Sequence, residues 1–198
     1  IGIFFASFPL AQILFMPLIG NMSDRYGRKG FIAGGLLLSS LLSVAYVFTP
    51  DIWSLTIVRF FQGLAVALIL PISSAYVGDL AEPQKRGELM GIFNLFLTSS
   101  IGVGPLLGGW ATENFGMDVG FYLMGILNFL AFVIALLFVA ERRSSQSALE
   151  QTSYRPLLKR IGIQGIALYR TVTAIQTGLW FSFLPLLAVE ILGINQSQ

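Results

Sequence analysis

The sequence predicts an all-α integral membrane protein in which six transmembrane helices are present. Two observations support this fold class. Of the 198 residues, 55% are hydrophobic and 11% are charged, whereas ordinary soluble domains contain roughly 45–50% apolar and about 25% charged residues. The apolar residues also gather in six runs long enough to cross a ~30 Å hydrocarbon core at ~1.5 Å per residue. The runs are residues 1–19, 31–48, 52–78, 89–110, 119–140 and 165–189.

Lysine and arginine predict the orientation of these runs. Ten of the twelve fall in three loops, residues 20–30, 79–88 and 141–164, and the turns on the opposite side contain none. The positive-inside rule therefore predicts that the three loops are cytoplasmic, in a plasma (inner) membrane. Trp53 is expected to anchor the other interface. The chain starts at Ile1 inside an apolar run, so we expect a fragment preceded by one further helix.

The first of these loops joins two apolar runs through a short polar stretch, which predicts a tight hairpin with its turn in water. Asp24 can cap the following helix and pair with Arg28, four residues later. The pattern resembles the loop signature of the major facilitator superfamily. It is carried by Gly20, Asp24, Arg25, Gly27, Arg28 and Lys29. The resemblance implies that these six residues form a cytoplasmic gate; the alternative is a simple topology anchor. The loop 79–88, with Glu82, Lys85, Arg86 and Gly87, is expected to pair with this gate.

The same resemblance implies a domain organisation. Members of this family have two halves of six helices, and the signature joins their second and third helices. Residues 1–140 would then be helices two to six of a twelve-helix fold. Residues 141–164 would be the cytoplasmic linker between the halves. Residues 165–198 would be helix seven and the start of the next loop.

Arg59 is the most informative single residue. It lies six residues after Trp53, which places it ~9 Å inside the interface. Burying an arginine in hydrocarbon costs roughly 3 kcal/mol, so it should face a cavity or an acid. Gln62 and Gly63 follow on the same helix face. Arg59-x-x-Gln62-Gly63 is similar to a second signature of the family, whose arginine is linked to proton coupling. The alternative is an arginine that reaches the outer headgroups.

The run 89–110 is rich in glycine. Gly104 and Gly108 predict a face for close helix approach, and Pro105 predicts a bend. Gly91, Gly104, Pro105, Gly108 and Gly109 resemble the fifth-helix signature of the drug/proton antiporter branch, with Ser100 where a second glycine is expected. A packing element without substrate contact is the local interpretation. The resemblance adds an expectation of export.

The run 165–189 resembles the seventh helix, which lines the central cavity. Gln176, Trp180 and Phe183 recur at helical spacing and are candidate substrate contacts through stacking and hydrogen bonds. Lipid contact or packing is the alternative. No acidic residue lies deep in any apolar run, so a proton-carrying carboxylate is expected elsewhere in the carrier.

These features predict a secondary active transporter that exports a small organic or drug-like compound by proton-coupled alternating access. The alternatives are a sugar or metabolite permease, or a non-transporting sensor on the same scaffold. Histidine and cysteine are absent, which removes thiol nucleophiles, histidine bases and most zinc sites. The protein is therefore not predicted to be an enzyme, and no metal or cofactor is expected. The predicted partners are a small-molecule substrate, protons, lipid and the second half of the carrier, and not nucleic acid.

Overall fold

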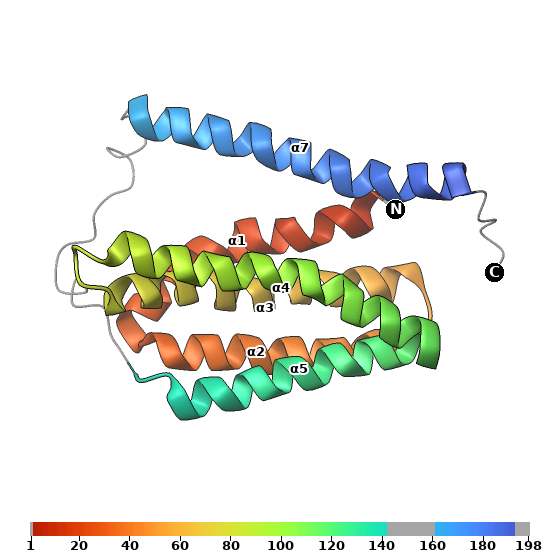
Figure 1. The fold of residues 1–198 in the computed structure, drawn as a ribbon, viewed down its shortest axis with the longest axis horizontal. Helices are drawn as coiled ribbons and strands as arrows, with labels where there is room; N and C mark the ends of the chain where they lie inside the picture. Colours follow the sequence, from red (N-terminus) through yellow and green to blue (C-terminus); the bar gives the residue numbers. More distant parts are fainter. Residues whose placement is uncertain (1, 142–160, 193–198) are drawn as a thin grey trace. The chain divides into compact units, whose positions relative to one another are not determined.

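The computed structural model describes residues 2–141 and the helix 161–192, where the side chains of residues 161, 166 and 180–192 are not described. Every regular element in these residues is an α-helix. The chain forms two units, one with five helices and one with a single helix (Figure 1). The first unit contains α1 (Gly2–Tyr26), α2 (Arg28–Val47), α3 (Ile52–Leu80), α4 (Arg86–Phe115) and α5 (Met117–Phe138). The second contains α7 (Ile161–Leu192).

Helices α1 to α5 are each long and apolar enough to cross a membrane. Large apolar side chains cover their outer surface, among them Ile13, Leu106 and Phe138. Such exposure suits lipid because the bilayer replaces water around these side chains. The sixth predicted span coincides with α7, a helix of 32 residues.

Most of the buried residues of α1 to α5 are small, namely glycine, alanine or serine. In the first unit, α3 packs between α1 and α2, while α5 packs on the other side of α2 and against α4. Ala11, Ala65 and Ala67 are completely buried. Larger apolar side chains form one buried cluster between α1, α2 and α3, to which these helices contribute Ile19, Ile32 and Ile72 respectively. Small side chains allow backbones to approach closely, which supplies the packing that drives helix association in lipid.

Two serines show how α2 uses polar groups in this packing. The buried Ser40 donates a hydrogen bond to the carbonyl oxygen of Gly125 on α5, at 2.9 Å. Ser43, which has no exposed surface, donates to Ser39 of its own helix at 2.8 Å. The first bond joins two helices and the second does not.

Five of the six described helices are longer than their apolar runs, which corrects the predicted loop boundaries; α5, with 22 residues, has the length of the run 119–140 but lies two residues earlier. Residues 20–26 continue α1, and a single residue, Gly27, separates α1 from α2. Gly27 has φ +101°, a conformation that glycine adopts readily, and its N–H donates to the carbonyl of Ser23 at 3.1 Å. Asp24 therefore lies in the last turn of α1 and does not cap α2, so that prediction is wrong.

The other boundaries shift for the same reason. Backbone hydrogen bonding does not depend on whether a side chain is apolar, so a helix can continue past the last apolar residue of its run. Helix α4 begins at Arg86, inside the predicted loop 79–88, and extends to Phe115, where Gly116 with φ +92° ends it. Figure 1 shows α4 bending in its second half, the half that contains Pro105. Residues 161–164 of the predicted linker belong to α7, and residues 142–160 lie outside the described part.

Candidate functional site

The Arg28 cluster, consisting of Asp24, Arg28 and Asp79, joins three helices at one end of the five-helix unit. Nη2 of Arg28 lies 3.1 Å from Oδ1 of Asp24, and Nη1 lies 2.7 Å from Oδ2 of Asp79. Arg28 is only 5% exposed. It begins α2, where the helix dipole is positive, and Asp79 lies in the last turn of α3, where the dipole is negative. The carboxylates therefore offset the burial of Arg28 and its unfavourable position at the start of α2, and the guanidinium in turn offsets the unfavourable position of Asp79 at the end of α3.

The sequence correctly predicted the Asp24–Arg28 pair, but the contact from the following loop comes from a different residue than expected. Asp79 makes it from the end of α3. Arg86 instead donates from Nε to the carbonyl oxygen of Gly78, at 3.1 Å, and so ties the start of α4 to the end of α3. Among the other signature residues, Arg25 is exposed, Lys29 is half-buried, and Gly20 has open space beside it.

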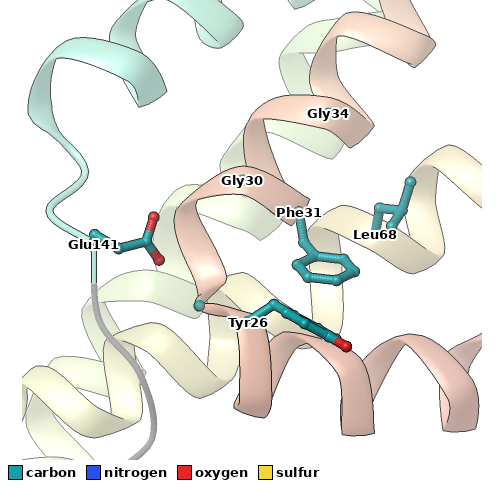
Figure 2. Close-up of a pocket in the computed structure, with 7 residues that line it drawn as sticks. Tyr26, Gly30, Phe31, Gly34, Leu68 and Glu141 are labelled. Carbon is teal, nitrogen blue, oxygen red and sulfur yellow. The ribbon is translucent and has the colours of Figure 1, made fainter.

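A shallow pocket of about 300 Å³ lies beside this cluster, at the start of α2. Figure 2 shows Tyr26, Phe31 and Leu68 on one side of the α2 backbone and Glu141 on the other. The Glu141 carboxylate occupies the space that a side chain at position 27 would fill. Gly27 is thus required both by its backbone conformation and by this contact. The remaining lining comes from Gly30 and Gly34.

The Arg59 cluster, consisting of Tyr46, Arg59 and Gln62, lies at the opposite end of α2. Tyr46 is 18 residues after Arg28, about 27 Å along the helix. The guanidinium carbon of Arg59 lies 5.3 Å from the ring centroid of Phe4 and 5.3 Å from that of Phe8. These distances fit cation–π contacts, which stabilise a charge where water is scarce. Nε of Arg59 is buried without a hydrogen-bond partner.

The other two members of the Arg59 cluster are bonded to each other. The Tyr46 hydroxyl donates to Oε1 of Gln62 at 2.8 Å and also interacts with Arg59. Tyr46 stacks on Phe121 of α5, with centroids 5.2 Å apart and planes 15° apart. Four helices, α1, α2, α3 and α5, therefore converge around one arginine.

Gly63 explains why α1 comes so close to this cluster. A Cβ atom at position 63 would collide with the carbonyl oxygen of Phe8 and lie 3.0 Å from Cβ of Ala11. Because the glycine has no side chain, the backbones of α1 and α3 touch here. This contact holds the Phe8 ring over Arg59.

The glycine signature of α4 makes no comparable contact within the five-helix unit. A Cβ added at any of its four glycines would meet none of the described atoms within 4 Å; these are Gly91, Gly104, Gly108 and Gly109. Ser100, which replaces the expected glycine, donates to the carbonyl of Phe96 in its own helix at 2.8 Å. The predicted face for close approach is present on α4 and is open.

The candidate substrate residues all fall on α7. Gln176 is exposed in its unit. The side chains of Trp180 and Phe183 lie outside those that the structure describes. Their contact with a substrate stays a prediction.

Sequence reasoning missed the partners that hold the two arginines. Asp79 was considered only as the start of a loop, and Tyr46, Phe4 and Phe8 look like ordinary members of apolar runs. A weak signal existed for Tyr46, because a hydroxyl near the end of an apolar helix needs a polar partner. Nothing in the local pattern indicates which residue provides it.

The comparison with known proteins agrees with this architecture. A family model described as Major Facilitator Superfamily matches residues 1–198. An uncharacterized transporter of this type from Methanocaldococcus jannaschii is 36% identical over 135 residues, 68% of this chain and 35% of the relative. Multidrug resistance protein 2 of Bacillus subtilis is 25% identical over 98% of this chain and 53% of its own length.

A third relative, described as a homologue of the multidrug resistance efflux pump PmrA in Lactococcus lactis, is 28% identical over 87% of this chain and 42% of its own. The chain thus spans about a third to a half of the length of these three relatives. The match over all 198 residues, the helical architecture and the spanning helices lead to one conclusion: the chain is multi-pass in a membrane and belongs to the major facilitator superfamily.

Proposed function

We propose that the full-length carrier exports small organic, drug-like compounds in exchange for protons, by alternating access. The names of the relatives from Bacillus subtilis and Lactococcus lactis support the substrate class and the direction of transport. The structural observation that supports proton coupling is the environment of Arg59.

Arg59 is a cation that lacks a fixed anion. Within residues 2–141, no carboxylate lies within ion-pair distance of its guanidinium. Two phenyl rings stabilise the charge while leaving its attraction for an anion largely intact. A carboxylate that releases its proton during transport would be stabilised by such a cation, because an opposite charge nearby favours the ionised form. That carboxylate is expected in parts of the carrier beyond these residues.

The Arg28 cluster is the proposed cytoplasmic gate, with loops 20–30, 79–88 and 141–164 on the cytoplasmic side. Asp24 and Asp79 are each partly exposed, with 48% and 34% of their side-chain surface accessible. Their oxygens can therefore exchange Arg28 for another cation or for helix N–H groups without a full desolvation cost. A contact that can be exchanged in this way suits a gate that opens and closes in each cycle.

The open glycine face of α4 is proposed to pack against the second half of the same carrier. Gly104 and Gly108 lie four residues apart, so they form one strip on which a helix backbone can approach closely. Gln176, Trp180 and Phe183 on α7 are proposed to contact the substrate in the cavity between the halves. Both assignments require the full-length protein.

The test uses inverted membrane vesicles that contain the full-length carrier, with a fluorescent pH probe and an imposed proton gradient. Lipophilic cations are added to wild type, Arg59→Ala and a matched control, Arg143→Ala in the predicted linker. We expect compounds to dissipate the gradient with wild type and the control but not with Arg59→Ala. If sugars or organic acids move instead, the permease alternative replaces the proposal. Ligand binding without any flux would indicate a sensor.

A further inference from the structure

Tyr46 of the Arg59 cluster contacts two neighbouring helices, α3 and α5. It is the second-last residue of α2 and is 6% exposed. Its ring stacks on Phe121 of α5, and its hydroxyl donates to Gln62 of α3 at 2.8 Å. The ring stack fixes the direction of the hydroxyl, since a stacked ring that is almost fully buried has few alternative rotamers.

The hydrogen bond to Tyr46 determines what Gln62 can do. Gln62 lies three residues after Arg59, so the two side chains are neighbours on one face of α3. The Gln62 side-chain oxygen is a natural acceptor for the guanidinium of Arg59. In the structure this oxygen accepts from Tyr46, and Nε of Arg59 is buried without a partner.

We propose that Tyr46 is a positioning residue for proton coupling: it holds the Gln62 oxygen toward α2 and so keeps this amide acceptor away from the Arg59 guanidinium, which can then attract an anion. The inference rests on the proposed proton-coupled export and names a residue that controls the surroundings of the Arg59 guanidinium. Without the hydroxyl, Arg59 loses its interaction with Tyr46, and the Gln62 oxygen loses its donor and turns to the guanidinium, because a partly buried acceptor without a partner is costly. The amide oxygen is a stronger acceptor than a phenol oxygen, so the exchange leaves the guanidinium more strongly occupied. Arg59 then attracts an anionic group of the transport cycle less strongly.

The test measures the pH profile of exchange for Tyr46→Phe in the full-length carrier, in the vesicle assay described above. We expect the exchange rate to fall about fivefold and the profile to move to higher pH. The sign follows from Arg59: a less available guanidinium stabilises an ionised carboxylate less, so the carboxylate keeps its proton at higher pH. The groups described around Arg59 are Phe4 and Phe8 on α1, which do not titrate, and Tyr46 itself.

The matched control is Tyr122→Phe, which also removes a tyrosine hydroxyl. Tyr122 lies on α5 and is 40% exposed. It should leave rate and profile unchanged. A second comparison tests whether Tyr46 acts through Gln62. If it does, the double variant Tyr46→Phe with Gln62→Leu has the same profile as Gln62→Leu alone, because the oxygen that Tyr46 holds is absent from both.

The outcomes separate the inference from the function on which it rests. Wild-type vesicles without any exchange would contradict the proposed function, and the inference with it. Wild-type exchange with an unchanged profile in Tyr46→Phe would overturn the inference alone. Tyr46→Phe could also lose rate and melt at a lower temperature while its pH profile stays unchanged. That result would show that Tyr46 is only structural and would also overturn the inference. If Tyr46→Phe does not fold, Gln62→Leu alone is the test: it has no amide oxygen that could turn to Arg59, so a shift of its profile to higher pH would overturn the inference.

Discussion

Arg28 and Asp79 form an ion pair of 2.7 Å between two helix ends whose dipoles oppose their charges. An arginine at the start of a helix and an aspartate at the end of one are each unfavourable by themselves. Together they stabilise both ends and fasten α2 to α3. The Asp24 contact to the same arginine is longer, at 3.1 Å, and comes from only four residues away.

This difference predicts unequal effects of two similar variants. Asp79→Asn removes the contact between helices and leaves a buried guanidinium with one carboxylate, so we expect a loss of ~1–2 kcal/mol in stability. Asp24→Asn removes a longer pair, whose carboxylate is 48% exposed, and should cost less, about 0.5 kcal/mol. Thermal unfolding of the full-length carrier in detergent measures both. A larger loss for Asp24→Asn would contradict the assignment of Asp79 as the main partner.

Gly63→Ala should destabilise the contact between α1 and α3. The added methyl group would collide with the backbone oxygen of Phe8, which cannot move away as a flexible side chain can. Overpacking of this kind costs typically ~1–3 kcal/mol. The matched control is Gly34→Ala in α2, where the added atom meets open space. Melting temperatures of the two variants should differ, with Gly34→Ala close to wild type, and equal values would argue against the close approach.

Ser40→Ala should weaken the contact between α2 and α5. It leaves the Gly125 carbonyl without the hydroxyl that now donates to it, and interhelical bonds in membranes are worth ~0.6 kcal/mol on average and up to ~1.7. Ser43→Ala is the control, because its hydroxyl bonds within α2. A shift in melting temperature for Ser40→Ala that is no larger than for Ser43→Ala would show that the bond contributes little.

The start of α3 should be sensitive to acid through Asp51. This residue caps the helix: its side chain accepts from the N–H of Trp53, and Ser54 completes a capping box. The hydrogen bond from the Ser54 hydroxyl, more than any other effect, lowers the pKa of Asp51 below its ordinary value of 3.8. The ionised form is thus favoured in the folded protein, and its contribution to stability is complete above 3.8 and is lost as the pH falls through the lower, folded-state pKa.

Asp51→Asn tests this because asparagine caps a helix but does not titrate. We expect wild type to melt at a higher temperature than Asp51→Asn at neutral pH, and the difference to shrink at pH values below 3.8. Thermal unfolding of both proteins across this range provides the measurement. A difference that grows on acidification would have the wrong sign for a depressed pKa.

Much of the fold could be predicted because length and hydropathy determine it. The apolar runs locate the centres of the helices, and the hairpin around Gly27 follows from the charges on either side. Helix ends were predicted poorly, because the residues after Ile19 continue the helix although they are polar. Local sequence shows where hydrocarbon ends and does not show where backbone hydrogen bonding ends.

The sites divide in a similar way. Arg28 and Arg59 could be selected from sequence, since a cation in or near an apolar run needs an explanation. Their partners could not, because the contacts to Asp79 and Tyr46 depend on how α2 packs against α3. A contact between residues far apart in the chain follows from helix packing, and the packing depends on glycines such as Gly63 whose importance appears only in three dimensions.

The missing side chain at Gly63 also limits how this bundle can move. If α1 slid along α3 by one helical turn, the Phe8 oxygen would meet the side chain of Arg59 or Ala67, which lie on the same face as Gly63, in place of bare backbone. Shear between packed helices is one common way in which proteins change shape, and it is blocked at this contact. A cysteine pair engineered to crosslink α1 to α3 should therefore leave transport intact, while the conformational change takes place at other helix contacts.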